Sequence, residues 1–182
     1  MRLIAWQLEH VVKCLVFYHP DDPAALRAEQ DALLLEVWQA CNKSGHELLL
    51  EVILPENGPD KDERHYHTIL EHFYQLGIKP DWWKLPPLSS ASWQQITALI
   101  EREDPWSRGI LILGLDAPSD KLRAGFAEAA AHPMIKGFAV GRTIFGQPSR
   151  RWMQGELSDE ALIEEVKRNY LTLIGYWREA RR

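Results

Sequence analysis

The sequence of 182 residues contains only two cysteines, Cys14 and Cys41, and neither belongs to a Cys-x-x-Cys pair. This scarcity argues against a disulfide framework, and it predicts two reduced, buried thiols of the kind found in cytoplasmic proteins. No apolar run approaches the length of a membrane span, and the run from Leu3 to Trp6 is too short for the core of a signal peptide. The sequence therefore predicts a cytoplasmic protein without a membrane partner.

Long basic runs are missing as well. The longest are the pairs Arg150-Arg151 and Arg181-Arg182, and the formal net charge is -5, so a nucleic-acid partner is not expected. The glycine-rich fingerprint G-x-G-x-x-G, the phosphate loop that ends in Gly-Lys-Ser/Thr and the serine elbow G-x-S-x-G are all absent. These absences remove the commonest nucleotide-binding and serine-hydrolase classes.

The sequence does contain short apolar runs that alternate with helical patterns. Five runs predict strands, at residues 10–18, 47–54, 80–87, 109–115 and 136–142. Between and after them, helices are predicted from an N-cap at Asp22 to Gly45, up to Leu76-Gly77, after Ser89 or Ser90, over residues 119–131 and from about Ser158. This alternation predicts a single α/β domain, residues 1–182, with a parallel sheet. Five units fit either an open doubly wound sheet or part of an eight-stranded barrel.

Each of the first three predicted strands carries one charged residue near its middle: Lys13, Glu51 and Lys84. At equivalent depth in neighbouring parallel strands, these side chains would form a buried ionisable cluster. The ammonium of Lys13 would then favour a neutral, nucleophilic amine at Lys84, and Glu51 would transfer protons, as lysine Schiff-base chemistry requires. Two alternatives stay open: an edge-strand Lys84 that reaches water, and an ion-paired interior without chemistry.

The last predicted strands end in glycines. Gly141 and Arg142 combine a backbone that a ligand can approach closely with a guanidinium suited to phosphate, at the end of the strand where parallel α/β folds bind ligands. Gly114 ends the preceding strand in a similar way. A Gly-Arg pair more often consists of a helix-capping glycine and a surface arginine. The phosphate prediction therefore rests on the position of this pair at the end of a strand more than on its two residue types.

Three histidines, His65, His67 and His72, raise the question of a metal site. On a helix, positions 65 and 67 point to different faces, and the motif H-E-x-x-H is absent. The sequence therefore predicts no metal site at these residues.

The charged strands and the terminal glycines, in this order, resemble the last five strands of class I sugar-phosphate aldolases, of which tagatose-bisphosphate aldolase is one relative. The matching stretches are Val12-Lys13, Leu50-Glu51-Val52, Asp81 to Leu85 and Val140-Gly141-Arg142. A closer resemblance covers nearly the whole chain. It is to the aldolase-like domain fused behind a sugar kinase in bifunctional 5-dehydro-2-deoxygluconokinase proteins of myo-inositol catabolism, especially over Val11 to Asp22 and Gly45 to Pro55.

The resemblance implies a (β/α)₈ barrel in which Lys84 matches the Schiff-base lysine, Glu51 the acid/base and Lys13 the lysine of the fourth strand. Gly141 and Arg142 match phosphate binders. The implied reaction is retro-aldol cleavage of 5-dehydro-2-deoxygluconate 6-phosphate to dihydroxyacetone phosphate and malonate semialdehyde, without a metal or other cofactor. Implied partners are this phosphorylated sugar and a fused sugar kinase. Two other functions stay open: a catalytically silent module for sugar-phosphate binding or subunit interaction, and a metal-dependent aldolase.

The resemblance also places Met1 where such a barrel begins its fourth strand. The first three strands, including the family's first-strand aspartate, then have no counterpart, and five strands cannot close an eight-stranded barrel. Three explanations stay open: a fragment of a longer protein, a split gene completed by a second chain, and a partial barrel that self-associates as a homo-oligomer. In each of them the reactivity of Lys84 depends on what completes the barrel wall.

Overall fold

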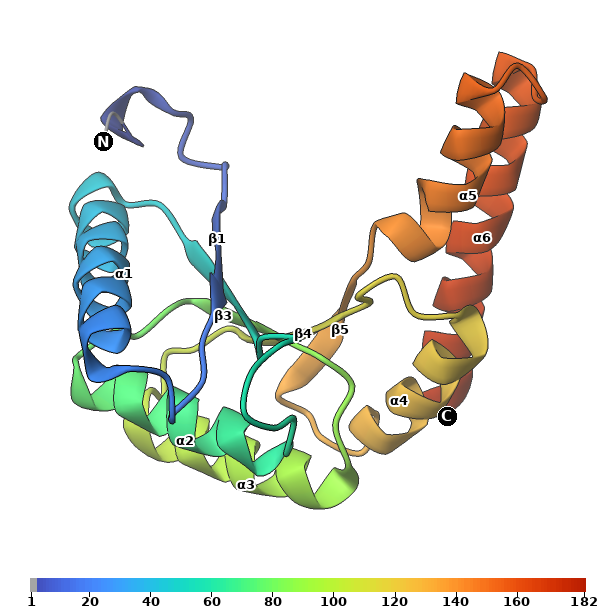
Figure 1. Ribbon diagram of the computed structural model, residues 1–182. Coiled ribbons are helices and arrows are strands. Elements are labelled where there is room, and N and C mark those ends of the chain that lie inside the picture. The colour runs from blue at the N-terminus through green and yellow to red at the C-terminus, as the bar shows by residue number, and fades with distance from the viewer. Residues whose placement is uncertain (1–2) are drawn as a thin grey trace. The chain divides into compact units, whose positions relative to one another are not determined.

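The computed structural model describes residues 3–182, in which strands alternate with helices (Figure 1). The strands are β1 (Val12–Phe17), β2 (Leu48–Ile53), β3 (Trp82–Leu85), β4 (Gly109–Leu113) and β5 (Ile135–Ala139). The helices are α1 (Ala24–Ser44), α2 (Arg64–Gln75), α3 (Ser90–Glu103), α4 (Ser119–Ala129), α5 (Arg142–Met153) and α6 (Asp159–Ala180), and a short 3₁₀ turn covers Leu3–Ala5.

The five strands form one parallel sheet in the order β1-β2-β3-β4-β5. The pairing of β1 with β2 and that of β2 with β3 define the register at the first three strands. Among the described residues the order does not return from β5 to β1, so the sheet is open. The predicted α/β class is confirmed, and five successive parallel units are consistent with part of a (β/α) barrel.

The chain divides into two compact units. The first comprises Met1–Leu85 and Ala91–Ile110, and the second comprises Pro86–Ser90 and Leu111–Arg182. The first unit therefore contains β1, β2 and β3 with α1 and α2, whereas the second contains α4, β5, α5 and α6.

The core of the first unit forms where α2 covers β2 and β3. Trp83 and Phe73 are both fully buried, and their rings lie parallel with centroids 6.5 Å apart. The indole N–H of Trp83 donates to the hydroxyl oxygen of Tyr74 at 2.9 Å, which satisfies the one polar atom of a buried tryptophan. Because side chains alternate along a strand, burying Trp83 and Leu85 against the helix turns Lys84 to the opposite face of β3.

The second unit is held by α6, which packs against α4 and α5. The ring of Phe126 in α4 is fully buried and meets the Trp177 ring of α6 edge-on at 5.6 Å. Helix α6 begins as predicted, because the Ser158 hydroxyl accepts a hydrogen bond from the Ala161 N–H at 3.2 Å.

Two predicted details near the helix starts are wrong. Asp22 does not cap α1: its carboxylate accepts a hydrogen bond from the His19 N–H at 3.0 Å, and Pro23 occupies the N-cap position. Arg142 is not the end of a strand but the first residue of α5, a helix that the sequence did not predict. Pro148 lies inside this helix, where Ile144 and Pro148 are both buried, and this packing outweighs the low helix propensity of proline.

In the described part of the chain, no helix is both long enough and apolar enough to cross a lipid bilayer.

Candidate functional site

Three charged side chains from β1, β2 and β3 meet in the first unit. The Nζ atom of Lys13 lies 2.9 Å from Oε2 of Glu51, and the Nζ atom of Lys84 lies 3.1 Å from Oε1 of the same carboxylate. Each carboxylate oxygen therefore faces one lysine. The structure thus brings together the three residues that the sequence singled out as a cluster.

The strand register explains which contacts form. Glu51 is level with Lys84 in the pairing of β2 with β3, and it is level with Leu15 in the pairing of β1 with β2. Lys13 pairs with Leu49 instead, one step earlier along the same face of the sheet. The expectation of equivalent depth is therefore correct for Glu51 and Lys84 but wrong for Lys13, whose long side chain bridges the extra step.

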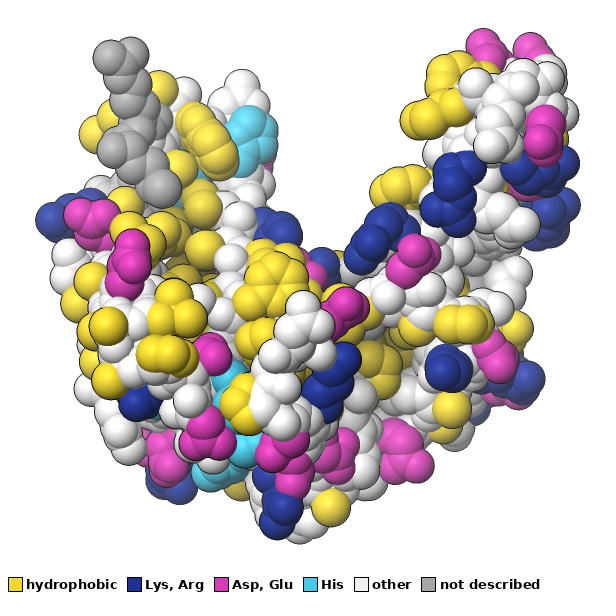
Figure 2. Space-filling view, viewed as in Figure 1, with side chains coloured by type: hydrophobic (Ala, Val, Ile, Leu, Met, Phe, Trp, Pro, Cys, Tyr) yellow, Lys and Arg dark blue, Asp and Glu magenta, His cyan; other side chains and the backbone are white. Residues whose placement is uncertain are grey.

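Burial also differs between the three residues. The exposed fractions of the side chains are 8% for Glu51, 15% for Lys84 and 49% for Lys13. Lys13 is half exposed because β1 is the first strand of the sheet and has a neighbouring strand on one side only. Strand β1 also exposes two hydrophobic side chains, Leu15 and Phe17. Hydrophobic side chains on the face shown are yellow in Figure 2. The predicted buried cluster is thus buried at Glu51 and Lys84 and open to water at Lys13.

The cluster combines the groups that amine chemistry needs. With all three groups ionised, two ammonium ions flank one carboxylate, and their attraction offsets the cost of burying Glu51. A proton that moves from Lys84 to Glu51 over 3.1 Å leaves a neutral amine, which is a nucleophile toward carbonyl carbon. The positive charge of Lys13 then remains beside the protonated carboxyl group.

The predicted phosphate-binding residues Gly114, Gly141 and Arg142 belong to the second unit. Gly114 follows β4, and a Cβ atom at this position would lie 2.8 Å from Cγ1 of Val140, which is closer than real Cβ atoms come. Gly141 occupies the N-cap position of α5, where a Cβ atom would lie 3.1 Å from the Phe145 ring. Close packing within the second unit therefore explains why both positions are glycine.

Arg142 lines a cavity of about 390 Å³ at the start of α5. Arg150 and Thr143 line the same cavity, and Asp116 contributes one carboxylate. The first N–H groups of a helix have no partner within it, and they carry the positive end of the helix dipole. Arg142 at the N-terminus of α5 and Arg150 from the last turn of the same helix give this cavity the positive charge that an anion requires.

The three histidines that the sequence singled out do not meet. Among the described residues, His72 pairs through Nε2 with Oδ2 of Asp31 at 2.8 Å, and His65 pairs through Nε2 with Oδ1 of Asp60 at 2.6 Å. His67 belongs to neither pair. The structure instead places His19, two residues after the end of β1, beside Asp60, with its Nε2 atom 3.7 Å from Oδ1.

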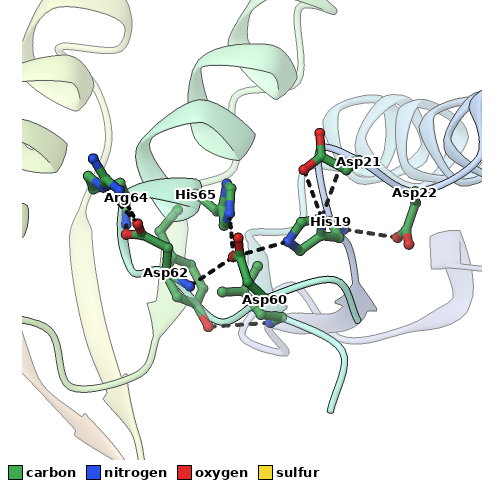
Figure 3. A network of polar contacts seen from close by, with 9 residues as sticks. His19, Asp21, Asp22, Asp60, Asp62, Arg64 and His65 are labelled. Carbon is green, nitrogen blue, oxygen red and sulfur yellow. Dashed lines mark hydrogen bonds and ion pairs between the residues drawn. The ribbon is translucent and has the colours of Figure 1, made fainter. Parts of the chain in front are cut away.

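Sequence reasoning overlooked His19 and Asp60. The available signal for His19 was its position directly behind an apolar strand, where parallel sheets place functional side chains. Asp60 lies in the loop between β2 and α2 and had no such signal. Hydrogen bonds from the Asp62 backbone N–H and from the His65 ring lower the pKa of Asp60 below the ordinary aspartate value (Figure 3).

Comparison with known proteins gives a family but no described function. No curated protein matches the chain. One family model, described as "Uncharacterized protein conserved in bacteria (DUF2090)", matches residues 1–181, which is nearly the whole sequence. The chain therefore belongs to the DUF2090 family.

Proposed function

We propose that this chain is the lysine-bearing part of a Schiff-base aldolase that acts on a phosphorylated keto sugar. The observation that carries the proposal is the contact between Lys84 and the buried carboxylate of Glu51, with 3.1 Å between Nζ and Oε1. A lysine whose amine is to attack a carbonyl needs a nearby group that takes its proton and later returns one. Glu51 is within hydrogen-bonding distance to do both.

The proposed reaction starts when Glu51 accepts a proton from Lys84. The neutral amine attacks the ketone carbon of the substrate, and Glu51 returns the proton to the hydroxyl group of the carbinolamine, which leaves as water. The resulting iminium ion accepts the electron pair of the bond between the α and β carbons as that bond breaks. The Glu51 carboxylate takes the proton of the β-hydroxyl group in the same step, so the aldehyde leaves and an enamine remains on Lys84. Glu51 returns this proton to the enamine carbon, and water hydrolyses the iminium ion to release the ketone product and the free lysine.

Lys13 has a supporting role in this proposal. Its ammonium remains 2.9 Å from Oε2 of Glu51, so a positive charge stays next to the carboxyl group through each proton transfer. The ammonium of Lys13 is a counter-charge for the carboxylate of Glu51 whenever Glu51 has given up its proton. In this proposal Lys13 forms no covalent bond to the substrate.

We propose separately that the second unit binds phosphate. Arg142 is suited to it because a guanidinium binds phosphate oxygens through paired N–H groups. Gly114 and Gly141 supply close-packed turns at the ends of β4 and β5, where parallel α/β folds bind phosphates. The support for this assignment is the cavity lined by Arg142 and Arg150.

The resemblance of the sequence to the aldolase-like domain of bifunctional 5-dehydro-2-deoxygluconokinase proteins suggests the substrate. The proposed reaction is cleavage of 5-dehydro-2-deoxygluconate 6-phosphate to dihydroxyacetone phosphate and malonate semialdehyde in the cytoplasm, beside a sugar kinase. The proposal also requires more barrel wall than five strands provide. We assign this wall to a longer form of the protein, to a second chain or to a second copy of this one.

Trapping with borohydride tests the proposal directly. Wild-type protein is incubated with dihydroxyacetone phosphate and borohydride, which reduces a Schiff base to a stable amine, and the modified residue is mapped by mass spectrometry. The adduct is expected at Lys84, and it should vanish in Lys84→Met but persist in Lys79→Met, a matched lysine outside the cluster. Adducts spread over surface lysines, or no adduct in a folded protein whose barrel wall is complete, would count against the aldolase.

The cavity at Arg142 favours a second candidate, a sugar-phosphate-binding module without catalysis. This function needs the cations of the second unit and not the amine of Lys84. It predicts that a sugar phosphate raises the melting temperature of the wild type and of Lys84→Met equally, whereas Arg142→Ala abolishes the shift. An adduct at Lys84 would decide against this candidate.

A further inference from the structure

The histidine that follows β1 has an unsatisfied ring nitrogen in the protein interior. The side chain of His19 is 0% exposed, and its Nε2 atom has no hydrogen-bond partner among the described residues. Buried polar groups are almost always paired, so an orphaned imidazole nitrogen calls for a ligand that the protein itself does not supply. Without an ion, the Asp21 N–H donates to the Nδ1 atom of this ring at 3.1 Å, which leaves Nε2 as the nitrogen that faces Asp60.

Two further ligating side chains face this nitrogen. Asp60 comes from the loop after β2, and its Oδ1 atom lies 3.7 Å from Nε2 of His19. His65 is the second residue of α2, and its Nε2 atom lies 2.6 Å from the same oxygen. One ligand atom from each of the three residues lies within 4.8 Å of the other two. Figure 3 shows the two imidazole rings on either side of the Asp60 carboxylate.

We propose that His19, Asp60 and His65 bind one divalent transition-metal ion, with Zn²⁺ as the best match. Zinc ligands lie about 2.0–2.2 Å from the ion, so the donor atoms of a tetrahedral site are roughly 3.3 Å apart. The observed separations of 2.6 and 3.7 Å lie on either side of this value. The ring nitrogens of His19 and His65 lie within 4.8 Å of each other, so side-chain movements on the order of 1 Å would bring all three pairs of donor atoms to this spacing.

The donor set selects the ion. Two imidazole nitrogens and one carboxylate suit zinc and its transition-metal neighbours, whereas Mg²⁺ and Ca²⁺ prefer sites made of oxygen alone. Three protein ligands leave the fourth position of a tetrahedral ion to water, as in catalytic rather than structural zinc sites. The site lies at the carboxyl ends of β1 and β2, and it does not depend on the proposed aldol chemistry.

The surrounding charges favour a cation. Asp21 and Asp22 follow His19 in the chain, and Asp62 lies in the same loop as Asp60. Arg64 is ion-paired with Asp62, so its charge is already matched by a carboxylate other than that of Asp60. Lys61 is the other basic residue of this segment, and no ion pair between it and Asp60 is found in the described part of the chain.

Binding through Nε2 fixes the positions of the protons. The ion replaces the hydrogen between His65 and Asp60, so both imidazoles coordinate as neutral rings that carry their proton on Nδ1. At His19 this proton needs an acceptor, and Oδ2 of Asp21 lies 3.9 Å from Nδ1. The Asp21 carboxylate then takes the place of the Asp21 N–H as the partner of the ring, an arrangement typical of metal-bound histidines.

Titration of the chelator-treated full chain with Co²⁺ and Zn²⁺ tests the site. One Co²⁺ per chain should give the visible absorption of a four-coordinate ion, Zn²⁺ should displace it with the same stoichiometry, and Zn²⁺ should raise the melting temperature. Mg²⁺ should neither displace the Co²⁺ ion nor raise the melting temperature. Binding of no ion, or of several weak ions without the visible bands, would overturn the proposal.

Variants locate the ion. Because His19 is fully buried, its replacement perturbs folding, so the decisive variants are Asp60→Asn and His65→Gln, with His67→Gln as the matched control on the same helix. Both decisive variants should weaken binding by more than the roughly 10- to 100-fold expected for Asp21→Asn, which removes only the outer partner. His67→Gln should bind as the wild type does. Retained affinity in Asp60→Asn and His65→Gln, or equal loss in His67→Gln, would place the ion elsewhere and overturn the assignment.

Discussion

Glu51 and Lys84 are level with each other on neighbouring parallel strands, and Oε1 of Glu51 lies 3.1 Å from Nζ of Lys84. Both side chains are at least 85% buried, so water screens this pair far less than it screens Lys13, which is half exposed. One carboxylate therefore takes part in two ion pairs of different strength. The first two predictions follow from this asymmetry.

A double-mutant cycle measures the inner pair. Glu51→Gln leaves two ammonium groups beside a neutral amide, and it should lower the free energy of unfolding by about 1–3 kcal/mol. Adding Lys84→Met removes one of these charges and should recover part of the loss, with a coupling energy of about 0.5–3 kcal/mol. Urea unfolding of the wild type, both single variants and the double variant gives the value. Additivity within about 0.3 kcal/mol would show that the contact contributes nothing.

The outer pair should behave as a surface ion pair. Lys13→Met is expected to cost less than about 1 kcal/mol of unfolding free energy, and the cost should shrink as salt is added. Lys84→Met, measured in the same way, should show a weaker dependence on salt. Equal salt dependence of the two variants would mean that the difference in burial has no electrostatic consequence.

The sequence predicted the fold class because the signal was local and repeated. Each strand is a short apolar run. Gly45, at a φ of 75°, marks the C-terminus of α1, and the Ser158 cap marks the N-terminus of α6. Helix α5 was missed because Gly146 and Pro148 lower its intrinsic propensity. What stabilises it is contact with α6, which no local pattern reports.

The site could be predicted only where a residue type was improbable in its local context. A lysine or a glutamate within an apolar strand is such a signal, and it located Lys13, Glu51 and Lys84. His19 and Asp60 follow a strand and lie in a polar loop, where such residues are ordinary. They meet because parallel strands bring successive loops to the same edge of the sheet, and that proximity exists only in three dimensions.

Two helical glycines of the second unit should respond in opposite directions to alanine. A Cβ atom at Gly125 in α4 would lie 2.5 Å from Cβ of Pro87, so Gly125→Ala should overpack this contact and cost about 1–3 kcal/mol. At Gly175 in α6, no described heavy atom lies within 4 Å of the added methyl group. Gly175→Ala should therefore stabilise the protein by about 0.5–1 kcal/mol through backbone entropy. Chemical denaturation distinguishes the two, and destabilisation by both would contradict the packing argument.

Three tyrosines of the first unit should make the fold sensitive to alkali. Burial raises the pKa of Tyr18, Tyr66 and Tyr74 above the ordinary value of about 10, and the charge of Asp31 adds to the effect at Tyr18. Below pH 10 the folded and unfolded states are both protonated, so these groups leave stability unchanged. Above about pH 10 the unfolded state loses its protons first, and the free energy of unfolding should fall by up to about 1.4 kcal/mol per pH unit for each tyrosine.

Tyr18→Phe isolates one of these groups, because it removes a hydroxyl that donates to Oδ1 of Asp31 at 3.1 Å and keeps the ring. The variant should lose less stability per pH unit above pH 10 than the wild type, by up to about 1.4 kcal/mol. Urea unfolding at several alkaline pH values measures the slope, and tyrosinate absorbance should rise together with the loss of helical circular dichroism. Ionisation of these tyrosines near pH 10 in a chain that keeps its helical signal would contradict the prediction, since it would mean that burial does not hold their protons.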